Sequence, residues 1–455
     1  MLRLRKPAVG RSCCLPIQMA SSNIMNMQDK KWEFVIVGSG AGGATLAREL
    51  SNKGRKVLVV EKGRYEKEAG TTWGQFHNFE LDRITAIFAK WKEQVIIYTA
   101  NGAGGTTVIS HGNGIRCLEE ELATCGITLE GEFAEAEREM RISPIAEGLL
   151  SDGSKRILWA SRELGYKMEP MPKFIDPSKC GKCGACAGGC VNGAKWTALD
   201  YLREATQSGA EIIYNTEIEQ VIVENGAAKG VKGIGPYGRI EIQSEVVILA
   251  AGGLRTPVIL QRSGIKEAGS GLSVDLVVDT YGVTKGLNQL HEPATALVDL
   301  EFHKSKGFIL SPSVGRRRVT NFTKFGVKGL TLPAHRLIGI MTKIADETVG
   351  HVYADGTVSK PVTERDWAKL REGSSIAKEI LIKAGADSHS IVFSKPQGGH
   401  PGGTAAIGRV VDKDLQTEVN NLFVCDASVF PAAPGLPPIL TIVALAKRLA
   451  KTLAA

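Results

Sequence analysis

The chain of 455 residues has no apolar run of about 18 residues, no fixed-period repeat and no low-complexity segment. We therefore expect no membrane span and no solenoid. Aromatic residues make up 6%, hydrophobic residues 43% and charged residues 23%, which is typical of a folded globular protein. A chain of this length can bury a large core without disulfide bonds.

An excess of one charge sign is also nearly absent from the body of the chain. Of the net charge of +8, residues 1–31 contribute +5, from six basic residues against Asp29, which leaves +3 for the rest. This balance predicts no nucleic-acid partner. The basic segment lacks an apolar signal-peptide core, so we expect an unstructured leader on a cytoplasmic protein. An organelle transit peptide and a start codon placed too early remain alternatives.

Cysteines are few but clustered, since four of nine fall in one short window at Cys180, Cys183, Cys186 and Cys190. Without an export signal, disulfides are disfavoured. Clustered thiols in a reducing compartment indicate a metal site.

The first strong pattern is a βαβ unit. An apolar strand over 33–37 leads into the glycine-rich turn 38–43, a helical stretch over 44–51 and a second strand over 56–60, followed by Glu61. This is the order of a dinucleotide-binding fingerprint. A plain glycine-rich turn is the alternative.

The spacing of the glycines matches the needs of a bound pyrophosphate. Gly38 permits the tight turn, Gly40 lets the backbone approach the phosphates, and Gly43 lets the helix pack on the strand. The helix N-terminus offers N–H groups to an anion, and Glu61 would accept from a ribose hydroxyl. The turn does not distinguish FAD from NAD. Its predicted cofactor-binding residues are Gly38, Ser39, Gly40, Ala41, Gly42 and Gly43.

Further patterns predict the surrounding elements. Residues 118–143 are acid-rich and are expected to be helical and solvated. Capping boxes begin helices at Thr197 and Thr363, and residues 211–249 read as a β-meander.

A buried strand over 421–426 ends in Asp426, and a proline-rich loop then leads to an apolar helix over 441–451. An acid at the carboxyl end of a parallel strand lies where α/β sheets bind ligands. The two ends of the chain are therefore expected to build one nucleotide-binding domain.

Four separated blocks resemble the glucose–methanol–choline (GMC) oxidoreductase family of FAD enzymes that oxidise alcohols. They are the fingerprint, the glycine-rich loop Gly104–Thr107, the segment Ala251–Ile265, and the stretch from His400 to Ala450. The third block departs from the family pattern at Gly253 and Lys266. Four blocks in order favour FAD over NAD.

The resemblance implies an α/β fold with a discontinuous Rossmann-type FAD-binding domain and an α+β substrate domain. The expected ranges are 32–117, 196–275 and 396–455 for the FAD domain, 118–175 and 276–395 for the substrate domain, and 176–195 for a cysteine-rich insertion. Besides the fingerprint and Glu61, it implies cofactor contacts at Gly104, Gly105, Thr106, Ile218, Asp426, Ala427 and Pro438.

The resemblance also implies that His400 takes the hydroxyl proton of the substrate as hydride leaves for flavin N5. One position departs from the family, which usually has Asn or His where this chain has Pro437. Proline offers no side-chain hydrogen bond, so another group must bind the substrate oxygen, with His111 and Asn113 as candidates. A second departure is the Ser110-His111 pair, where the family often has Asn-Gly.

The cysteine window has the spacing C-x2-C-x2-C-x3-C, which is typical of ferredoxin-type clusters. A [4Fe–4S] cluster is the expected occupant, while zinc, a three-iron cluster and no metal remain alternatives. A cluster would pass electrons from reduced flavin to an external acceptor. We therefore expect a dehydrogenase of a small alcohol-type substrate. An electron-transfer or C=C-reducing flavoprotein and a non-catalytic flavin- or metal-binding protein are the alternatives.

Overall fold

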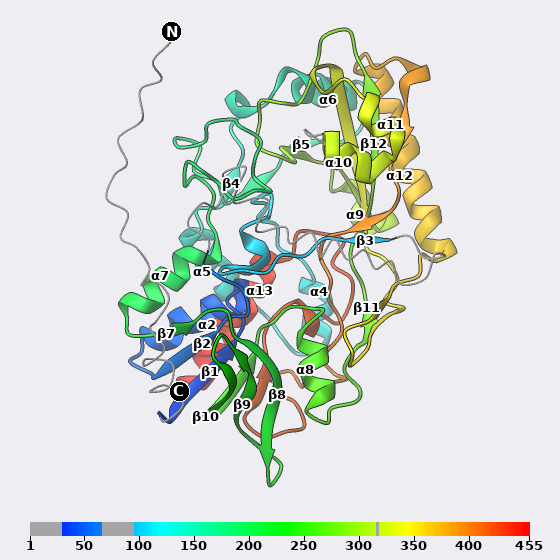
Figure 1. Ribbon diagram of the computed structural model, residues 1–455. Helices are drawn as coiled ribbons and strands as arrows, with labels where there is room; N and C mark the ends of the chain where they lie inside the picture. Colours follow the sequence, from blue (N-terminus) through cyan, green and yellow to red (C-terminus); the bar gives the residue numbers. More distant parts are fainter. Residues whose placement is uncertain (1–29, 66–94, 315–317) are drawn as a thin grey trace.

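The computed structural model describes residues 30–65, 95–314 and 318–455, so residues 1–29 of the expected leader lie outside it. Its first layer is a sheet whose parallel part has the order β7-β2-β1-β10-β20 (Figure 1). The strands are β1 (Trp32–Val37), β2 (Val57–Val60), β7 (Glu211–Ile213), β10 (Gly238–Leu249) and β20 (Leu422–Val424). The predicted mixed α/β fold is confirmed.

Strand β10 belongs to two sheet regions. Its last residues pair in parallel with β1 and β20, while its first half pairs antiparallel with β9 (Ala227–Gly235), which in turn pairs with β8 (Glu217–Glu224). The predicted meander is therefore right for these three strands. It is wrong for β7, which adds to the edge of β2 in parallel. Helix α7 (Ala198–Gln207) precedes β7 as a crossover helix, and such a connection favours parallel pairing.

Helix α2 (Ala41–Ser51) packs between α7 and α13 (Ile439–Leu453). Two of its glycines permit this. A Cβ on Gly42 would lie 1.9 Å from the carbonyl oxygen of Cys425, and one on Gly43 would lie 2.0 Å from that of Gly38. The first turn of α2 thus touches the backbone of the turn that precedes it and of the chain that leaves β20.

The acid-rich segment forms two helices, α4 (Glu119–Thr124) and α5 (Glu130–Glu139), separated by a turn at Gly126. Both predicted capping boxes are confirmed. Thr197 caps α7 with Asp200, and Thr363 caps α12 (Glu364–Lys383) with Asp366.

The second layer is a sheet with the order β14-β15-β12-β19-β3, to which β18 adds beside β12. Helix α12 covers it and packs against α6 (Asp152–Glu163) (Figure 1). The strands are β3 (Ile96–Ile97), β12 (Leu276–Val283), β14 (Phe308–Pro312), β15 (Leu337–Ile344), β18 (Val392–Phe393) and β19 (Gln397–Gly398).

Two hydrophobic cores correspond to these layers. Helix α5 contributes to the first core and packs on α13, whereas α6 contributes to the second. The expected segment 118–175 thus adds to both cores, and the exact domain boundaries stay a prediction.

The remaining strands and helices are short, and several of the strands form small sheets of their own. The strands are β4 (Ser143–Pro144), β5 (Glu169–Pro170), β6 (Pro172–Lys173), β11 (Ser270–Leu272), β13 (Leu297–Val298), β16 (Gly350–Val352) and β17 (Val358–Ser359). The helices are α8 (Thr256–Arg262), α9 (Glu301–Lys306), α10 (Arg318–Phe325) and α11 (Val327–Thr331). Within the described ranges, no helix is both long and apolar enough to cross a membrane.

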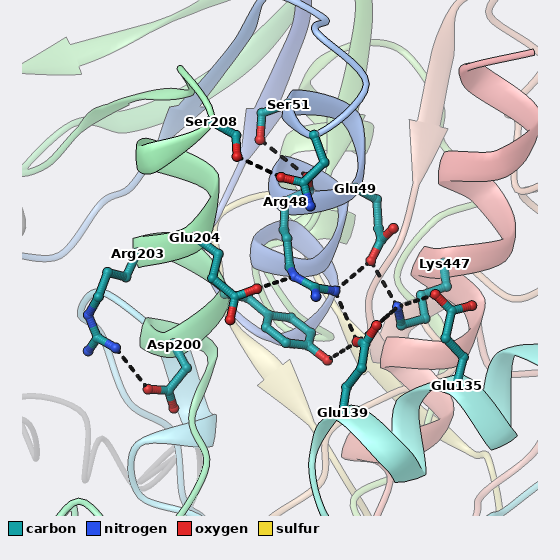
Figure 2. Close-up of polar contacts among 12 residues, drawn as sticks. Arg48, Glu49, Ser51, Glu135, Glu139, Asp200, Arg203, Glu204, Ser208 and Lys447 are labelled. Atoms are coloured by element: carbon teal, nitrogen blue, oxygen red, sulfur yellow. Dashed lines mark hydrogen bonds and ion pairs between the residues drawn. The ribbon is translucent and has the colours of Figure 1, made fainter.

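A buried ion-pair network joins three helices of the first layer (Figure 2). The ammonium of Lys447 on α13 is fully buried and donates to Glu49 on α2, at 2.8 Å, and to Glu135 and Glu139 on α5, at 2.9 and 3.1 Å. Arg48 also pairs with Glu49 and Glu139. Because Lys447 lies between three carboxylates, its charge holds α2 and α5 against the C-terminal helix.

We predict that Lys447→Met lowers the free energy of unfolding by about 3 kcal/mol, because three carboxylates then face one another without their shared cation. Denaturant unfolding followed by circular dichroism measures the change. The control is Lys304→Met, since Lys304 is exposed and pairs with the exposed Glu120 at 2.7 Å, where an ion pair contributes about 1 kcal/mol or less. Equal losses in the two variants would contradict the role given to Lys447.

Candidate functional site

Glu61 follows β2 and is bound to the turn before α2. Its Oε2 accepts from the backbone N–H of Ser39 at 3.0 Å and from the Ser39 hydroxyl at 2.6 Å, and its Oε1 accepts from Gly63 N–H at 2.7 Å. Burial raises the pKa of Glu61, while these hydrogen bonds lower it. The predicted acid and the predicted glycine turn are thus in direct contact.

The N-terminus of α2 has the geometry of a phosphate cradle. Gly40 precedes the helix without a side-chain cap, and no acidic residue occupies the first turn. A Cβ on Gly40 would meet no atom within 4 Å, so its side faces open space. The residues present therefore fit a dinucleotide pyrophosphate, which needs uncovered N–H groups and close backbone approach.

The second glycine loop lies against this cradle. Gly104, in the left-handed conformation, donates its N–H to the Ser39 hydroxyl at 3.1 Å and precedes a short 3-10 helix, η2 (Gly105–Thr107). A Cβ on Gly105 would lie 3.0 Å from Gly40. Thr106 is exposed beside it.

Asp426 ties the ends of β10 and β20 together. Its carboxylate accepts from Gly252 N–H at 2.8 Å, from the Thr256 hydroxyl at 2.6 Å and from Ser428 N–H at 2.7 Å. Ala427 accepts from Gly403 N–H at 3.0 Å. The third and fourth sequence blocks therefore meet at the carboxyl edge of the parallel sheet.

Two other predicted cofactor residues lie at this edge of the first layer. Ile218 is buried in β8, two residues after Thr216, whose N–H donates to the carbonyl oxygen of Glu61 at 3.0 Å. Pro438 is the residue that precedes α13.

His400 lies on the segment that follows β19 and crosses the end of β10. A Cβ on Gly253 would lie 2.1 Å from the carbonyl oxygen of Pro401, so this segment passes in backbone contact with the chain after β10. His400 Nδ1 is 2.9 Å from Asp275 Oδ2, and about 31% of the imidazole is exposed. Because Nδ1 donates to the carboxylate, Nε2 is left as the acceptor.

Asp275 is the partner that sequence reasoning missed. It is fully buried, has φ of +53°, and accepts from Gly435 N–H at 2.8 Å. Its other neighbour is the Lys343 ammonium at 3.6 Å. Burial and Lys343 lower the pKa of His400, whereas Asp275 raises it. An acid inside the apolar run 272–278 was the signal that could have flagged it.

The two candidates for the substrate-oxygen partner differ in their surroundings. The Asn113 amide is engaged, since its nitrogen donates to Thr295 and its oxygen accepts from the Lys173 ammonium. His111 Nδ1 lies 3.4 Å from the Thr295 hydroxyl, which leaves Nε2. Burial and the nearby ammonium groups of Lys173, Lys195 and Lys324 lower the pKa of His111 to about 3, and a charge on His400 would lower it further. The His111 imidazole is therefore neutral.

The cysteine window forms one loop, and its four cysteines form no disulfide within the described ranges. Burial raises the pKa of the Cys180 thiol, and so do its electrostatic interactions with the other three cysteines. Two sulfur atoms accept backbone N–H groups, from Lys182 to Cys180 and from Ala194 to Cys190. Cys183 is exposed, so one side of the loop reaches the surface.

Sequence reasoning also missed two buried lysines. Lys195 donates to the carbonyl oxygens of Val108 at 2.7 Å, Ser110 at 2.7 Å and Cys186 at 2.8 Å. Lys173 donates to the carbonyl oxygen of His111 at 3.1 Å. Burial lowers the pKa of each to about 8. Buried and exposed lysines look alike in a sequence, so no signal marked them.

Comparisons with known proteins agree with this architecture. The GMC oxidoreductase family models match residues 32–288 and 356–446. An uncharacterized protein of Methanocaldococcus jannaschii is 33% identical over 92% of this chain and 98% of its own. A long-chain-alcohol oxidase of Arabidopsis thaliana is 24% identical over 94% of this chain and 68% of its own. The crystal structure of pyridoxine 4-oxidase from Mesorbium loti superposes with a TM-score of 0.70 at 16% identity, over 92% of this chain and 99% of that one.

We predict that Gly40→Ala folds normally but loses its bound flavin. The new methyl group meets no protein atom, yet it occupies the space through which a dinucleotide backbone must approach the helix. Flavin absorbance per polypeptide and the thermal unfolding midpoint measure the two effects. Gly131→Ala on α5 serves as the control outside the cradle, because a Cβ there also meets no atom within 4 Å. Full flavin occupancy in Gly40→Ala would show that the cofactor lies elsewhere.

Proposed function

Because the chain belongs to the GMC oxidoreductase family, we propose that it is an FAD-dependent dehydrogenase that oxidises a CH–OH group of a small alcohol to a carbonyl. The observation that carries this proposal is the Asp275–His400 pair at 2.9 Å, on the segment that lies in backbone contact with the chain after β10 at Gly253. An imidazole with an unprotonated Nε2 is a suitable base for a hydroxyl proton.

The residues that would hold FAD are those of the cradle, with Glu61 toward the ribose and the Gly104–Thr106 loop beside the flavin. When bound, FAD supplies a hydride acceptor. Oxidation of the alcohol removes one hydride and one proton, and His400 Nε2 takes the proton. Asp275 accepts from Nδ1 and thereby holds the ring in the tautomer that this step needs.

We propose His111 as the group that binds the substrate oxygen in place of the residue missing at Pro437. Its neutral imidazole has electrostatic contact with His400, and its Nε2 is not engaged by the Thr295 contact. Asn113 is unsuited to this role because Lys173 and Thr295 occupy its amide.

A second candidate function is favoured by Pro437 itself. This buried proline removes the usual second hydrogen bond to a substrate hydroxyl. An electron-transfer or C=C-reducing flavoprotein does not need that bond. The two candidates differ in their reductant, which is an alcohol in the first case and a reduced electron carrier in the second.

We predict that His400→Ala slows reduction of the bound flavin by an alcohol about 10²- to 10⁴-fold. In the wild type the reduction rate falls as pH drops through the His400 pKa, which lies below the ordinary 6.5. Asp275→Asn moves this midpoint further down, because it removes the carboxylate that raises that pKa. Anaerobic stopped-flow bleaching with a panel of alcohols measures all three. Bleaching by a reduced carrier alone would favour the second candidate.

We further propose that electrons leave through an iron–sulfur cluster on the loop Cys180–Cys190 to an external one-electron acceptor. The spacing C-x2-C-x2-C-x3-C supports this proposal, because it lets several thiolates of one loop each bind their own iron. The exposed side of the loop at Cys183 would face the acceptor.

We predict that protein purified without oxygen contains about four iron and four sulfide per polypeptide and no stoichiometric zinc. Elemental analysis alongside flavin quantitation measures this ratio. Cys183→Ser should lower the iron content while leaving flavin bound, since the cradle lies outside the loop. Only trace iron in the wild type would refute the cluster proposal. It would not refute the dehydrogenase proposal, which dye-linked alcohol oxidation tests separately.

A further inference from the structure

The ammonium of Lys195 is buried in an unusual setting. Its three hydrogen bonds go to backbone carbonyls of Val108, Ser110 and Cys186. In the part of the chain that the structure describes, no carboxylate lies within ion-pair distance of it. Carbonyl oxygens satisfy its donors, but they do not balance its charge.

Burying an uncompensated charge costs several kcal/mol, so buried ammonium groups normally have a counter-charge. The Lys195 ammonium reaches the cysteine loop directly, since it donates to the carbonyl oxygen of Cys186 at 2.8 Å. Negative charge on Cys186 and Cys190 would oppose the lowering of its pKa by burial. A second buried cation, Lys173, lies close enough to interact with Lys195 and is itself stabilised by Cys186, Glu292 and Cys180. Two interior cations thus face one cysteine loop, which predicts negative charge on that loop.

We propose that Lys195 is the counter-cation of an anionic [4Fe–4S] centre on the Cys180–Cys190 loop and raises the reduction potential of that centre. Four thiolates outweigh the charge of the cluster core, so the centre is negative, and one-electron reduction makes it more so. A fixed positive charge beside Cys186 therefore stabilises the reduced form more than the oxidised form. This inference rests on the cluster in the proposed function.

The same lysine connects the centre to the reaction site. Its hydrogen bonds to Val108 and Ser110 reach the segment that begins at the flavin loop, with Gly105 against Gly40, and continues to His111. Lys195 thus fixes the cysteine loop to the backbone between the two glycine-rich blocks.

The test uses anaerobically purified holoprotein reduced stepwise with dithionite, with the cluster followed by electron paramagnetic resonance. Lys195→Met is expected to shift the cluster midpoint potential to more negative values, and Lys195→Arg to shift it less because the charge remains. The matched control is Lys179→Met, which removes an exposed charge next to Cys180. Solvent screens that charge, so its shift should be small.

An unchanged potential in Lys195→Met with full iron and flavin would overturn the inference. If Lys195→Met keeps flavin and fold but loses iron, Lys195→Gln is measured in its place, because its amide keeps a donor for the loop carbonyls without the charge, and the same negative shift is expected. If that variant is insoluble, Lys173→Met removes the second cation and carries the same expectation and the same refutation. Failure of alcohol oxidation alone leaves these potentials unaffected, so the two proposals can fail separately.

Discussion

The site depends on backbone-to-backbone contact at the carboxyl edge of the parallel sheet. Helix α2 can enter between the ends of β10 and β20 because Gly42 meets the carbonyl oxygen of Cys425 and Gly43 meets that of Gly38. Any side chain at these positions would push the helix away from the sheet. The N-terminus of α2 would then no longer face the space beside Gly40. Close packing of the helix therefore determines where an anionic cofactor can bind.

A second constraint brings the distant His400 to the same edge. Asp275 begins the run into β12, in the second layer, yet it accepts from both His400 and the backbone of Gly435, which lies just before α13. One buried carboxylate thus links three chain segments from both layers. The backbone of Asp275 is left-handed, a conformation that few residues adopt. Because its carboxylate binds both His400 and Gly435, a change in the Asp275 backbone would move the imidazole and the proline-rich loop together.

Most of the features that were predictable are local in the sequence; the exception is the C-terminal strand β20, which was expected beside the N-terminal unit and pairs with β10. The Gly38–Gly43 turn, the acid after β2 and both capping boxes follow from residues a few positions apart. The parallel pairing of β7 with β2 was not predictable, because the sequence of an isolated three-residue strand does not indicate which strand it pairs with. Asp275 is an acid inside an apolar run, which could have marked it, but its partner His400 is 125 residues away and the sequence does not identify that partner.

In the proposed function, one loop would serve both proton and electron transfer. The segment from Gly104 to His111 touches the cradle through Gly105, binds the Lys195 ammonium through its carbonyls, and ends at a neutral imidazole. Lys195 also binds the carbonyl oxygen of Cys186, so this segment is tied to the cysteine loop. A proton would go to a base through a short hydrogen bond, whereas electrons would leave through the cysteine loop, which reaches the surface at Cys183. A displacement of this segment would therefore disturb both transfers.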